Sequence, residues 1–522
     1  MNRLALIITL WIATVIVACG GSGSVPTPPP PTGSFSNASL NGQYAFSMSG
    51  ADGVTGSFFA RVGSFTADGH GNITAGIEDV NTVLDVPQTL AFTSSTYSIQ
   101  ADGRGIINLT NSTGTLSFSV TMLSPSQGLI VQTDLNATAS GTFVIQNVNS
   151  FTTAGISGTY VFDFSGLDPG GNPDSIVGQF VSTGSGTFSS GLLDENDNAQ
   201  LVSAAPFTGS SYQMDGTNGA TFGRGTLSFT ANGTTFNYVF YIVNGSRVRM
   251  METGSNALTV GDAIAQSSVP ATNANFNGNF VFLLTGSGTS GPITRIGRFA
   301  ADGNGNLGSI AADTNDAGTV AKVPSGSLSS TTYAIDSANP GTGRGTLTFT
   351  DSKLGDFQFV FYLSSSSGGV IQDISKNNVA DGSIQLQTGA PFSNSSLAGD
   401  YGLNFAGVSS NSAVGVTAEE DFVGHITLSS ASSSNVTGAV DFSEFSSNQG
   451  VFTNIVVSGN GLMVAGDGTN TGATRNALSL KLNAAPSSTL NFVPYILNSQ
   501  TIFLAGTDSN RVISGTVTVQ AP

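Results

Sequence analysis

Apolar and polar residues alternate along short segments throughout the chain, and no long helical period appears. The clearest segment is 115–123, where every second residue is apolar: Leu116, Phe118, Val120 and Met122. The same alternation recurs at 236–242 and 357–363. This period is typical of β-strands with one face in an apolar core and the other in water. The pattern therefore predicts an all-β protein.

Residues 37–148 show the order of strands that recurs along the chain. Alternation and turn residues predict about eight strands in this segment. They lie near 43–49, 57–66, 72–80, 94–101, 104–110, 115–123, 128–134 and 140–146. Short turns between them favour an antiparallel meander. Because a meander of this size can close and leave no free edge, we expect a barrel, with a two-sheet β-sandwich as the alternative.

Three sequence markers recur in the same order and divide the chain into four modules. Each module opens with Gly-x-aromatic, and the aromatic residues are Tyr44, Tyr160, Phe280 and Tyr401. Gly-Arg-Gly follows at 103–105, 223–225 and 343–345, and the fourth copy has Thr474-Arg475-Asn476. A closing strand ends in Gln, at Gln146, Gln266, Gln385 or Gln387, and Gln520. The markers predict β modules at 37–148, 153–267, 273–388 and 393–521, the last one divergent.

The opening Gly-x-aromatic resembles the start of lipocalin-like barrels, where Gly-x-Trp covers the barrel floor. Here Tyr or Phe stands in the place of Trp in all four modules. The resemblance implies that each module is a barrel of eight meandering strands.

The first 18 residues have the features of a signal peptide. Arg3 precedes an apolar run from Leu4 to Val17, which is shorter than the roughly 20 residues of a membrane-spanning helix. The run ends in Ile16-Val17-Ala18-Cys19, which closely resembles the bacterial lipobox. The resemblance implies cleavage before Cys19 and lipidation of its thiol, which would anchor the mature protein to a membrane. It also places the protein in the cell envelope, at the outer membrane, because Gly20 rather than Asp follows the cysteine.

Segment 19–36 continues from the cysteine as a Gly-, Ser- and Pro-rich tether.

The net charge of the chain limits the kinds of partner that it can bind. Only 15 residues are basic against 32 acidic ones, for a net charge of -17. Such a chain repels phosphate backbones, so we expect no nucleic-acid partner. Cys19 is the single cysteine, so no intramolecular disulfide can form and each core must be stabilised by burial.

Two glycine-rich segments, 68–72 and 302–306, look superficially like calcium loops. The spacing of an EF-hand fails in both, and alternating Gly and Asx residues are also what a tight hairpin turn needs. We therefore interpret them as turns. The densest acidic segment is 194–197, in which Asp194 and Asp197 are the best candidates for a metal site, although we expect none.

The strongest candidates for a structural ion pair are an acid and an arginine that recur in each module. The acid of each module is Asp79, Asp194, Asp313 or Asp441, and the arginine is Arg104, Arg224, Arg344 or Arg475. A buried guanidinium needs a partner, and a carboxylate accepts its fork in two hydrogen bonds. We expect the two to pair across neighbouring strands within each module. The alternatives are an arginine that binds an anionic ligand and one that lies in solvent at a turn.

No repeated set of acid, base and nucleophile appears, so we expect a non-catalytic protein without a cofactor. The sequence predicts a membrane-anchored extracytoplasmic lipoprotein with binding or structural modules, whose ligand or protein partner it does not identify. A surface adhesion or spacer protein and a hydrolase with an unrecognised site are the alternatives. Large polar cavities inside the modules would favour ligand binding. Filled barrels would favour a spacer, and a polar cluster in one copy alone would favour catalysis.

Overall fold

A computed structural model describes residues 34–522 except 54–55, 83–85, 255–256, 268, 270–271, 412–415, 431–435, 446–448, 472–474 and 484–487. The signal peptide, Cys19 and nearly all of the tether lie outside the described residues. Among those residues, no helix is long and apolar enough to cross a bilayer.

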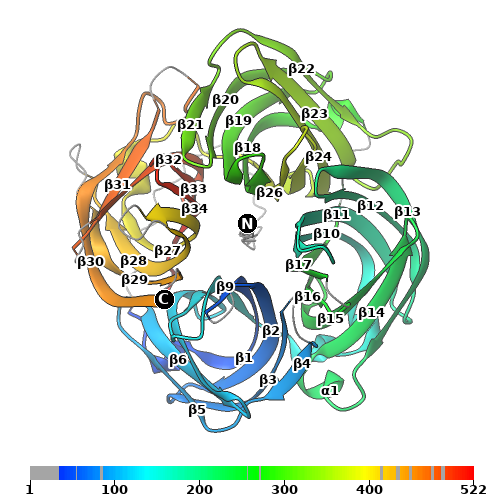
Figure 1. Cartoon of the computed structure of the whole chain (residues 1–522), viewed down its shortest axis with the longest axis vertical. Coiled ribbons are helices and arrows are strands. Elements are labelled where there is room, and N and C mark those ends of the chain that lie inside the picture. The colour runs from blue at the N-terminus through cyan, green and yellow to red at the C-terminus, as the bar shows by residue number, and fades with distance from the viewer. Residues whose placement is uncertain are drawn as a thin grey trace, which may run out of the picture.

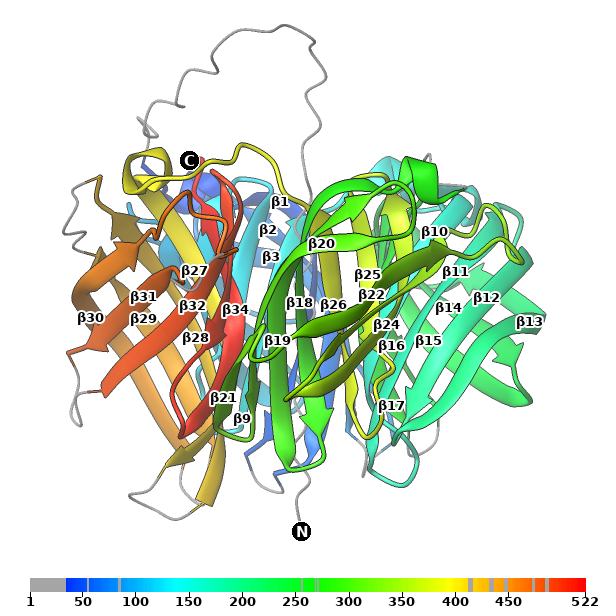
Figure 2. The ribbon, with the colours of Figure 1, turned by 90° about the horizontal axis from the view of Figure 1, so that it is seen from above.

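The described chain forms four antiparallel β modules that stand side by side in a closed ring (Figure 1). Module 4 lies next to module 1, so segments from the two ends of the described chain meet. The strands run between the two faces of the ring (Figure 2). Among the described residues, the main contacts between modules join each one to its two neighbours in the ring. Module interiors and module junctions are therefore the places to look for a functional site.

Module 1 contains the 3-10 helix η1 (Asn37–Ser39) and nine strands. These strands are β1 (Asn41–Asp52), β2 (Phe58–Asp68), β3 (Asn72–Thr82), β4 (Gln88–Ala91), β5 (Ser95–Ile99), β6 (Arg104–Asn111), β7 (Gly114–Ser124), β8 (Gln127–Gln132) and β9 (Ala137–Ile145).

Module 2 follows two short 3-10 helices, η2 (Val148–Ser150) and η3 (Thr153–Gly155), and contains one helical turn, α1 (Gly219–Phe222). Its strands are β10 (Ser157–Leu167), β11 (Pro173–Thr183), β12 (Phe188–Asp197), β13 (Gln200–Met214), β14 (Arg224–Ala231), β15 (Thr234–Asn244), β16 (Arg247–Glu252) and β17 (Leu258–Ala265).

Module 3 follows η4 (Asn273–Asn275). Its strands are β18 (Asn277–Gly288), β19 (Gly291–Asp302), β20 (Leu307–Asp316), β21 (Thr319–Val323), β22 (Leu328–Ile335), β23 (Arg344–Asp351), β24 (Gly355–Ser365), β25 (Gly368–Asp373) and β26 (Val379–Leu386).

Module 4 follows η5 (Asn394–Leu397). Its strands are β27 (Gly399–Asn411), β28 (Val416–Leu428), β29 (Val436–Phe445), β30 (Gln449–Met463), β31 (Ala477–Leu482), β32 (Ser488–Asn498), β33 (Thr501–Gly506) and β34 (Arg511–Val519).

The predicted all-β class and the barrel are confirmed, and the β-sandwich alternative is wrong. Modules 2 and 4 are closed barrels of eight strands, and in module 1 the pairing of β2 with β3 closes the sheet. Module 3 departs from this, since its nine strands form an open sheet with β21 and β22 at the edges. A single bridge, Asn306 with Thr332, links the two sides of this opening. The extra strand in modules 1 and 3 arises because the counterpart of the long β13 is divided in two.

The opening Gly-x-aromatic occupies the same place in each module. Tyr44 pairs with Phe65 and Ile145, and Tyr160 pairs in the same way with Phe180 and Ala265. The hydroxyl of Tyr44 donates to the carbonyl of Pro125 in the β7–β8 turn, at 2.7 Å. Glycine is required two residues earlier because the backbone there has a positive φ, +132° at Gly42.

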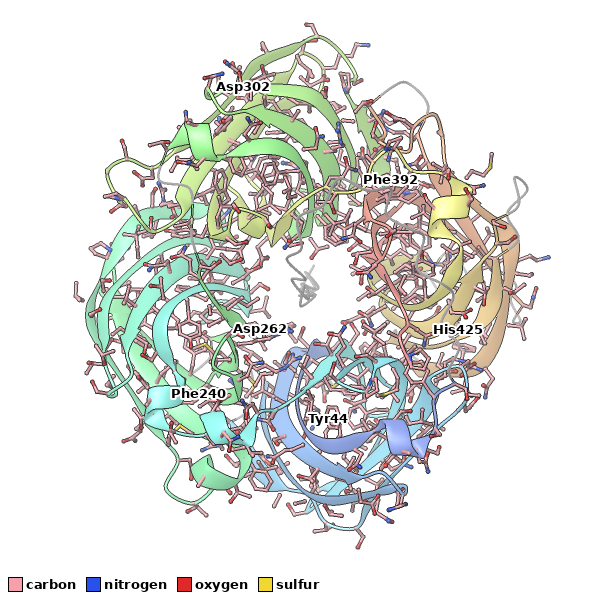
Figure 3. All side chains as sticks on the ribbon, turned by 180° about the vertical axis from the view of Figure 1, so that it is seen from behind. Tyr44, Phe240, Asp262, Asp302, Phe392 and His425 are labelled. Atoms are coloured by element: carbon pink, nitrogen blue, oxygen red, sulfur yellow. The ribbon has the colours of Figure 1, made fainter. Side chains whose placement is uncertain are left out.

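Each barrel interior is filled by its own apolar cluster. In module 2 the rings of Phe207 and Phe229 stack with centroids 4.4 Å apart, and Phe162 lies beside both. Figure 3 shows Tyr44 and Phe240 inside their barrels among the surrounding side chains. The alternation found in the sequence thus places large aromatic side chains inside every module, and packing of this kind dominates the stability of such cores.

Candidate functional sites

The repeated acid and arginine pair between modules, so the expected pairing within each module is wrong. Asp79 of module 1 accepts two hydrogen bonds from Arg224 of module 2, from Nη2 to Oδ1 and from Nε to Oδ2, both 2.8 Å. The hydroxyl of Tyr241 in module 2 also donates to Asp79 Oδ2, at 2.6 Å. The three side chains form a buried junction triad of acid, arginine and tyrosine.

Strand alternation explains why the partners lie in different modules. Asp79 stands between Glu78 and Val80, whose side chains face the barrel interior, so its own side chain points out of the barrel. Arg224 is paired with Tyr241 across β14 and β15, and both also face outward. Outward-facing residues meet the next module rather than each other. The sequence separation within a module carried no information about this.

The second and third junctions repeat the triad. In the second, Arg344 binds Asp194 at 2.7 Å through both Nε and Nη2, and Tyr362 donates to the same carboxylate at 2.6 Å. Burial opposes the charge of Arg344, but the hydrogen bonds and charge of Asp194 raise the guanidinium pKa above its ordinary value. In the third junction, Arg475 and Tyr495 bind Asp313, at 3.2 and 2.6 Å.

The fourth junction, between modules 4 and 1, closes the ring without a direct pair. Arg104 donates to Asp102 of its own module at 2.9 Å and to the side-chain oxygen of Asn454 at 2.9 Å. Asn454 in turn donates its backbone N–H to Asp441. The tyrosine of the triad is replaced by Thr121, whose buried hydroxyl has no hydrogen-bond partner among the described residues.

The closing glutamines also cross the junctions. Gln146 donates to the carbonyls of Phe222 and Ile242 in module 2, at 3.1 and 2.6 Å. Gln520 does the same at ring closure, to Asp102 and Met122 of module 1, at 2.9 and 2.8 Å. Of the two candidates in module 3, Gln387 has this role and donates to Ile496.

The closing glutamine approaches the neighbouring module at its Gly-Arg-Gly marker. Its first glycine has a positive φ in modules 1 to 3, +84° at Gly103 and +72° at Gly343. A Cβ on Gly103 would also stand 2.6 Å from the amide nitrogen of Gln520. Glycine is therefore needed there both for the turn and for the approach of the neighbouring module.

The polar residue two positions after the repeated acid completes each junction. Asn81 donates to the carbonyl of Glu252, and Asn196 donates to those of Asp373 and Asn378, all in the following module. Ser443 forms the corresponding contact with Thr138 of module 1, at 2.8 Å. The repeated motifs of the sequence thus hold the ring together.

The glycine-rich segments behave as turns. Asp68 accepts hydrogen bonds from the backbone N–H groups of His70 and Asn72 and from the Asn72 side chain, at 2.7, 3.0 and 2.7 Å. These bonds lower the pKa of Asp68 to about 2. Asp302 makes the same set of contacts in module 3. The carboxylates are occupied by their own turns.

The two candidate metal ligands lie apart. Asp194 belongs to the second junction, where Arg344 and Tyr362 occupy it. Asp197 lies on the same strand but faces the interior end of barrel 2, because it stands an odd number of positions, three, after Asp194. Across the described part of the chain, no three His, Cys, Asp or Glu side chains are grouped to hold a metal ion.

Asp197 instead belongs to an acidic cluster that the sequence analysis missed. The cluster consists of Asp168, Asp174, Glu195, Asp197 and Glu252 at one end of barrel 2. Burial and the charge of Asp197 raise the pKa of Glu195 to about 7. Burial raises the pKa of Glu252 to about 7 as well, and that of Asp197, which also feels Asp168, to about 6. The sequence analysis applied the alternation rule to apolar positions only. Applied to polar positions as well, the rule would have placed four of these residues on the interior faces of β11, β12 and β16.

Comparisons with known proteins leave the family open. No family model matches the chain, and no curated protein matches it. Among solved structures, a mutant of transferrin binding protein B from Haemophilus parasuis covers 75% of this chain and 81% of its own, at 11% identity and a TM-score of 0.19. Transferrin binding protein B from Neisseria meningitidis covers 76% and 84%, at 9% identity and a TM-score of 0.18. Scores this low mean that the chains do not superpose as whole molecules, so the likeness says nothing about what this chain binds.

Two pairs of buried acids form a further feature of the junctions. Asp163 of module 2 meets Asp381 of module 3, and burial together with Asp381 raises the pKa of Asp163 well above its usual range. At ring closure, Glu419 and Asp421 stand together on β28, and burial raises the pKa of Asp421 to about 7. Each pair lies on outward-facing strand positions against the neighbouring module.

The histidines take no part in a triad of Ser, His and Asp. His70 is exposed in its turn, and its backbone N–H binds Asp68. His425 lies 2.6 Å from the side-chain oxygen of Gln520, through its Nδ1 atom. It therefore orients the glutamine that closes the ring.

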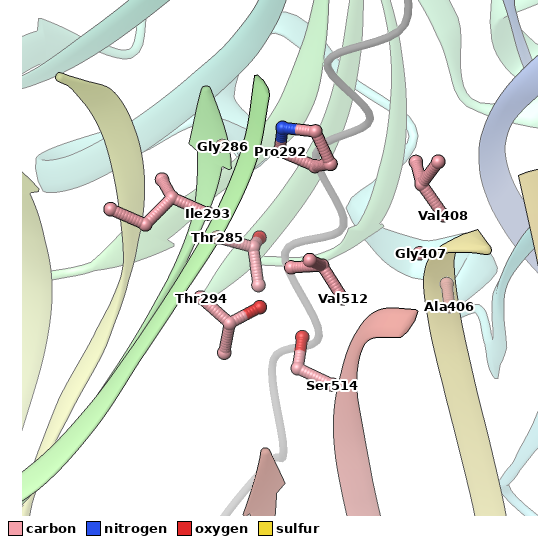
Figure 4. Close-up of a pocket in the computed structure, with 10 residues that line it drawn as sticks. All are labelled: Thr285, Gly286, Pro292, Ile293, Thr294, Ala406, Gly407, Val408, Val512 and Ser514. Carbon is pink, nitrogen blue, oxygen red and sulfur yellow. The ribbon is translucent and has the colours of Figure 1, made fainter. Parts of the chain in front are cut away.

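Two hollows of the surface have lining residues of interest. A crevice between modules 3 and 4, with Thr285, Pro292 and Ser514 among its walls (Figure 4), has a volume of about 10 Å³, enough for one water molecule. A wider groove of about 530 Å³ in module 2 is lined by residues 201–206, Thr208, Asn232 and Gly233. No charged side chain lines either one.

Proposed function

We propose that the mature protein is a lipid-anchored lipoprotein of the cell envelope whose four modules form a rigid, non-catalytic ring. Its role is structural, as a platform held on the membrane, and macromolecular partners bind its outer surface. The lipobox at Cys19 and the tether behind it support the anchor.

The packing of the module interiors is the observation that carries this proposal. A barrel that binds an apolar ligand keeps a cavity of several hundred Å³ inside. Here each interior holds a cluster of about twenty or more buried apolar side chains, including stacked rings. Filled barrels favour a structural role over ligand storage.

The use of the repeated residues points the same way. The residues that recur in every module are the acid, the arginine, the Asn or Ser after the acid, and the closing Gln. With the exception of Asp441, which binds Asn454 of its own module, they make contacts between modules. Because the recurring polar residues serve assembly of the ring, we infer that the function of the protein depends on the intact ring.

Two measurements test the proposal. A fluorescent fatty acid titrated into the mature protein should show no saturable binding, whereas one site per barrel would contradict a structural role. Full-length protein expressed in a Gram-negative host should partition into detergent with acyl chains on Cys19. The Cys19→Ala variant should fail to do so, and an unmodified Cys19 in the wild type would contradict the anchor.

A hydrolase is the second candidate, and one observation favours it. The acidic cluster of module 2 has no arginine partner, whereas acids at this end of the other three modules bind one. Paired carboxyl groups can cleave glycosidic bonds. A panel of glycosidase substrates tests this. Activity that disappears in Glu195→Gln and persists in Asp316→Asn, which changes the counterpart of Asp197 in module 3, would replace the structural proposal.

A further inference from the structure

The end of barrel 2 holds more uncompensated acid than any other described interior. Asp174 is 96% buried, given a residual exposure of 4%, and its Oδ1 atom has no hydrogen-bond partner. Glu195, Asp197 and Glu252 lie close enough for their charges to act on it. None of these four acids forms an ion pair with a described residue.

The floor of the cluster is hydrogen bonded, and its opening reaches solvent. The hydroxyls of Tyr238 and Thr259 lie 2.8 Å apart, and Thr259 donates to Glu252 Oε2 at 2.9 Å. Glu195 and Asp197, nearer the barrel end, are partly exposed. A ligand group entering from the end of the barrel would therefore meet carboxyl oxygens on several strands.

In the other three modules, an internal arginine occupies this end of the barrel. Arg61 binds Glu78 in module 1 at 3.1 Å, and Arg295 binds Asp373 in module 3 at 2.5 Å. In module 4, Arg511 forms two hydrogen bonds with Glu420, at 2.8 and 3.2 Å. Each of these barrels thus encloses a guanidinium group of its own.

Strand register shows that module 2 keeps the acids and lacks the arginine. Counted from the opening aromatic residue, Asp174 occupies the position of Glu420, and Glu252 occupies that of Asp373. Both counterparts bind an arginine in their own modules. The corresponding arginine positions in module 2 are filled by Ile176 and Ala257.

We propose that this end of barrel 2 binds the guanidinium group of a small ligand, which takes the place of the internal arginine of the sister modules. Asp174 and Glu252 receive the planar fork, and Glu195 and Asp197 surround its outer side. A carboxylate is the natural acceptor for this group because it can form two parallel hydrogen bonds with it.

The chemistry of the site favours an organic cation over a metal ion. No three acids of the described chain are grouped for metal coordination. The acids spread over β11, β12 and β16 instead, which suits a flat group with donors on several edges. The proposal is independent of the lipid anchor and of the structural role of the ring.

Calorimetric titration of the mature protein with agmatine tests the site. We expect one agmatine per chain at neutral pH, with 1,4-diaminobutane and CaCl2 as comparison ligands that bind at least about tenfold more weakly. Asp174→Asn should weaken agmatine binding by about tenfold or more, since it removes a charged hydrogen bond. The matched Asp316→Asn change in module 3 should leave it unaltered.

The sharpest variant is Ile176→Arg, which places an arginine where modules 1 and 3 carry theirs. It should abolish agmatine binding and raise the melting temperature, so that loss of binding cannot be ascribed to unfolding. Absence of agmatine binding to the wild type, preferential binding of calcium, or binding that survives in Ile176→Arg would each overturn the proposal. The first of these would mean that protons alone neutralise the cluster.

Discussion

Three junctions of the ring join modules that follow each other along the chain, and the fourth joins modules 4 and 1, which do not. The first three contain a bidentate or single acid–arginine contact reinforced by a tyrosine hydroxyl. The fourth replaces these contacts with Asn454 and Thr121. Its apolar cluster is also small, with four buried residues against twelve from modules 1 and 2 at the first junction. The junction without a covalent link is thus the one with the weakest side-chain contacts.

The hydrogen bonds that the fourth junction retains show which contacts ring closure requires. Gln520 keeps both of its hydrogen bonds to module 1, and the following residue, Ala521, donates to the carbonyl of Leu123 at 2.7 Å. The linked junctions have the same backbone bond, for example from Asn147 to Val243. Backbone docking of the closing strand is therefore common to all four contacts, and the ion pair is an addition found in three. We expect the ring to open first between modules 4 and 1.

The largest effect should come from removing the arginine partner of a buried acid at a junction between consecutive modules. Arg224→Met leaves Asp79 buried with Tyr241 as its main remaining junction partner, which should cost about 3–5 kcal/mol of unfolding free energy. The equivalent Arg104→Met should cost only about 1 kcal/mol, because Arg104 binds a partly exposed Asp102 and a neutral amide. Urea denaturation of both variants measures the difference.

A double variant separates the lost pair from lost packing. Arg224→Met combined with Asp79→Leu removes both charges, and it should recover most of the stability because apolar replacements of buried pairs are well tolerated. Equal losses in Arg224→Met and Arg104→Met would mean that the two kinds of junction do not differ energetically.

The fold could be predicted from sequence because its determinants are periodic. Alternation at 115–123 predicted β7 (Gly114–Ser124), and the repeat of Tyr44, Tyr160, Phe280 and Tyr401 predicted four equivalent modules. The short β4 was missed since its four residues are mostly exposed and show no apolar face. The opening of module 3 was also unpredictable, because it depends on how β21 and β22 meet rather than on the pattern within either strand.

The sites were harder to predict than the fold. Asp79 and Arg224 were each recognised as repeated charges that need partners, but a repeat gives the same signal whether partners lie within a module or between modules. The outward direction of both side chains shows that their partners lie in other modules. This could be used only once the modules were known to form a ring. In module 2 the acidic segment 194–197 was recognised, but Asp174 and Glu252 were overlooked because they lie far from it in sequence, although their charges act together in the folded chain.

The pH dependence of stability should sharpen the comparison, because Glu419 and Asp421 lie at the fourth junction. Burial raises the pKa of both groups, to about 7 for Asp421, so the folded state binds protons more tightly than the unfolded chain. The stability they contribute is complete below the ordinary carboxyl pKa and is lost as pH rises through the folded value. Between pH of about 5 and 8, we expect a loss of about 2 kcal/mol.

Glu419→Gln identifies the source of that loss. The substitution removes one charge of the pair, so the slope of stability against pH should become shallower. Hydrogen exchange should show the change first in β28 and β9, on the two sides of the fourth junction. A pH slope that is unchanged in Glu419→Gln would assign the dependence to the acids of module 2 instead.

Removing a closing glutamine should have an intermediate effect that depends on the junction. Gln520→Ala leaves the carbonyls of Asp102 and Met122 without their cross-junction donor, at a cost of about 1–2 kcal/mol. Gln266→Ala removes the same two kinds of bond from a junction that keeps its triad. We expect native-state hydrogen exchange at the module 4–module 1 contact to accelerate in Gln520→Ala, whereas Gln266→Ala should lower global stability without opening the second junction. Local opening in both would show that the triad does not hold its junction closed.

The smallest effect should have opposite signs at the two kinds of junction. Tyr241→Phe removes a 2.6 Å hydrogen bond to the buried carboxylate of Asp79 and should cost about 1 kcal/mol, since the ring itself still packs. Thr121 occupies the same position at ring closure, is fully buried, and has no partner for its hydroxyl among the described residues. Thr121→Val keeps the shape of the side chain and removes the unpaired polar atom, so it should be neutral or stabilise the protein by up to about 1 kcal/mol. Thermal unfolding of the two variants beside the wild type measures both signs in one experiment. Destabilisation by Thr121→Val as large as that by Tyr241→Phe would mean that the hydroxyl of Thr121 has a partner in solution, and that the fourth junction is better bonded than its contacts indicate.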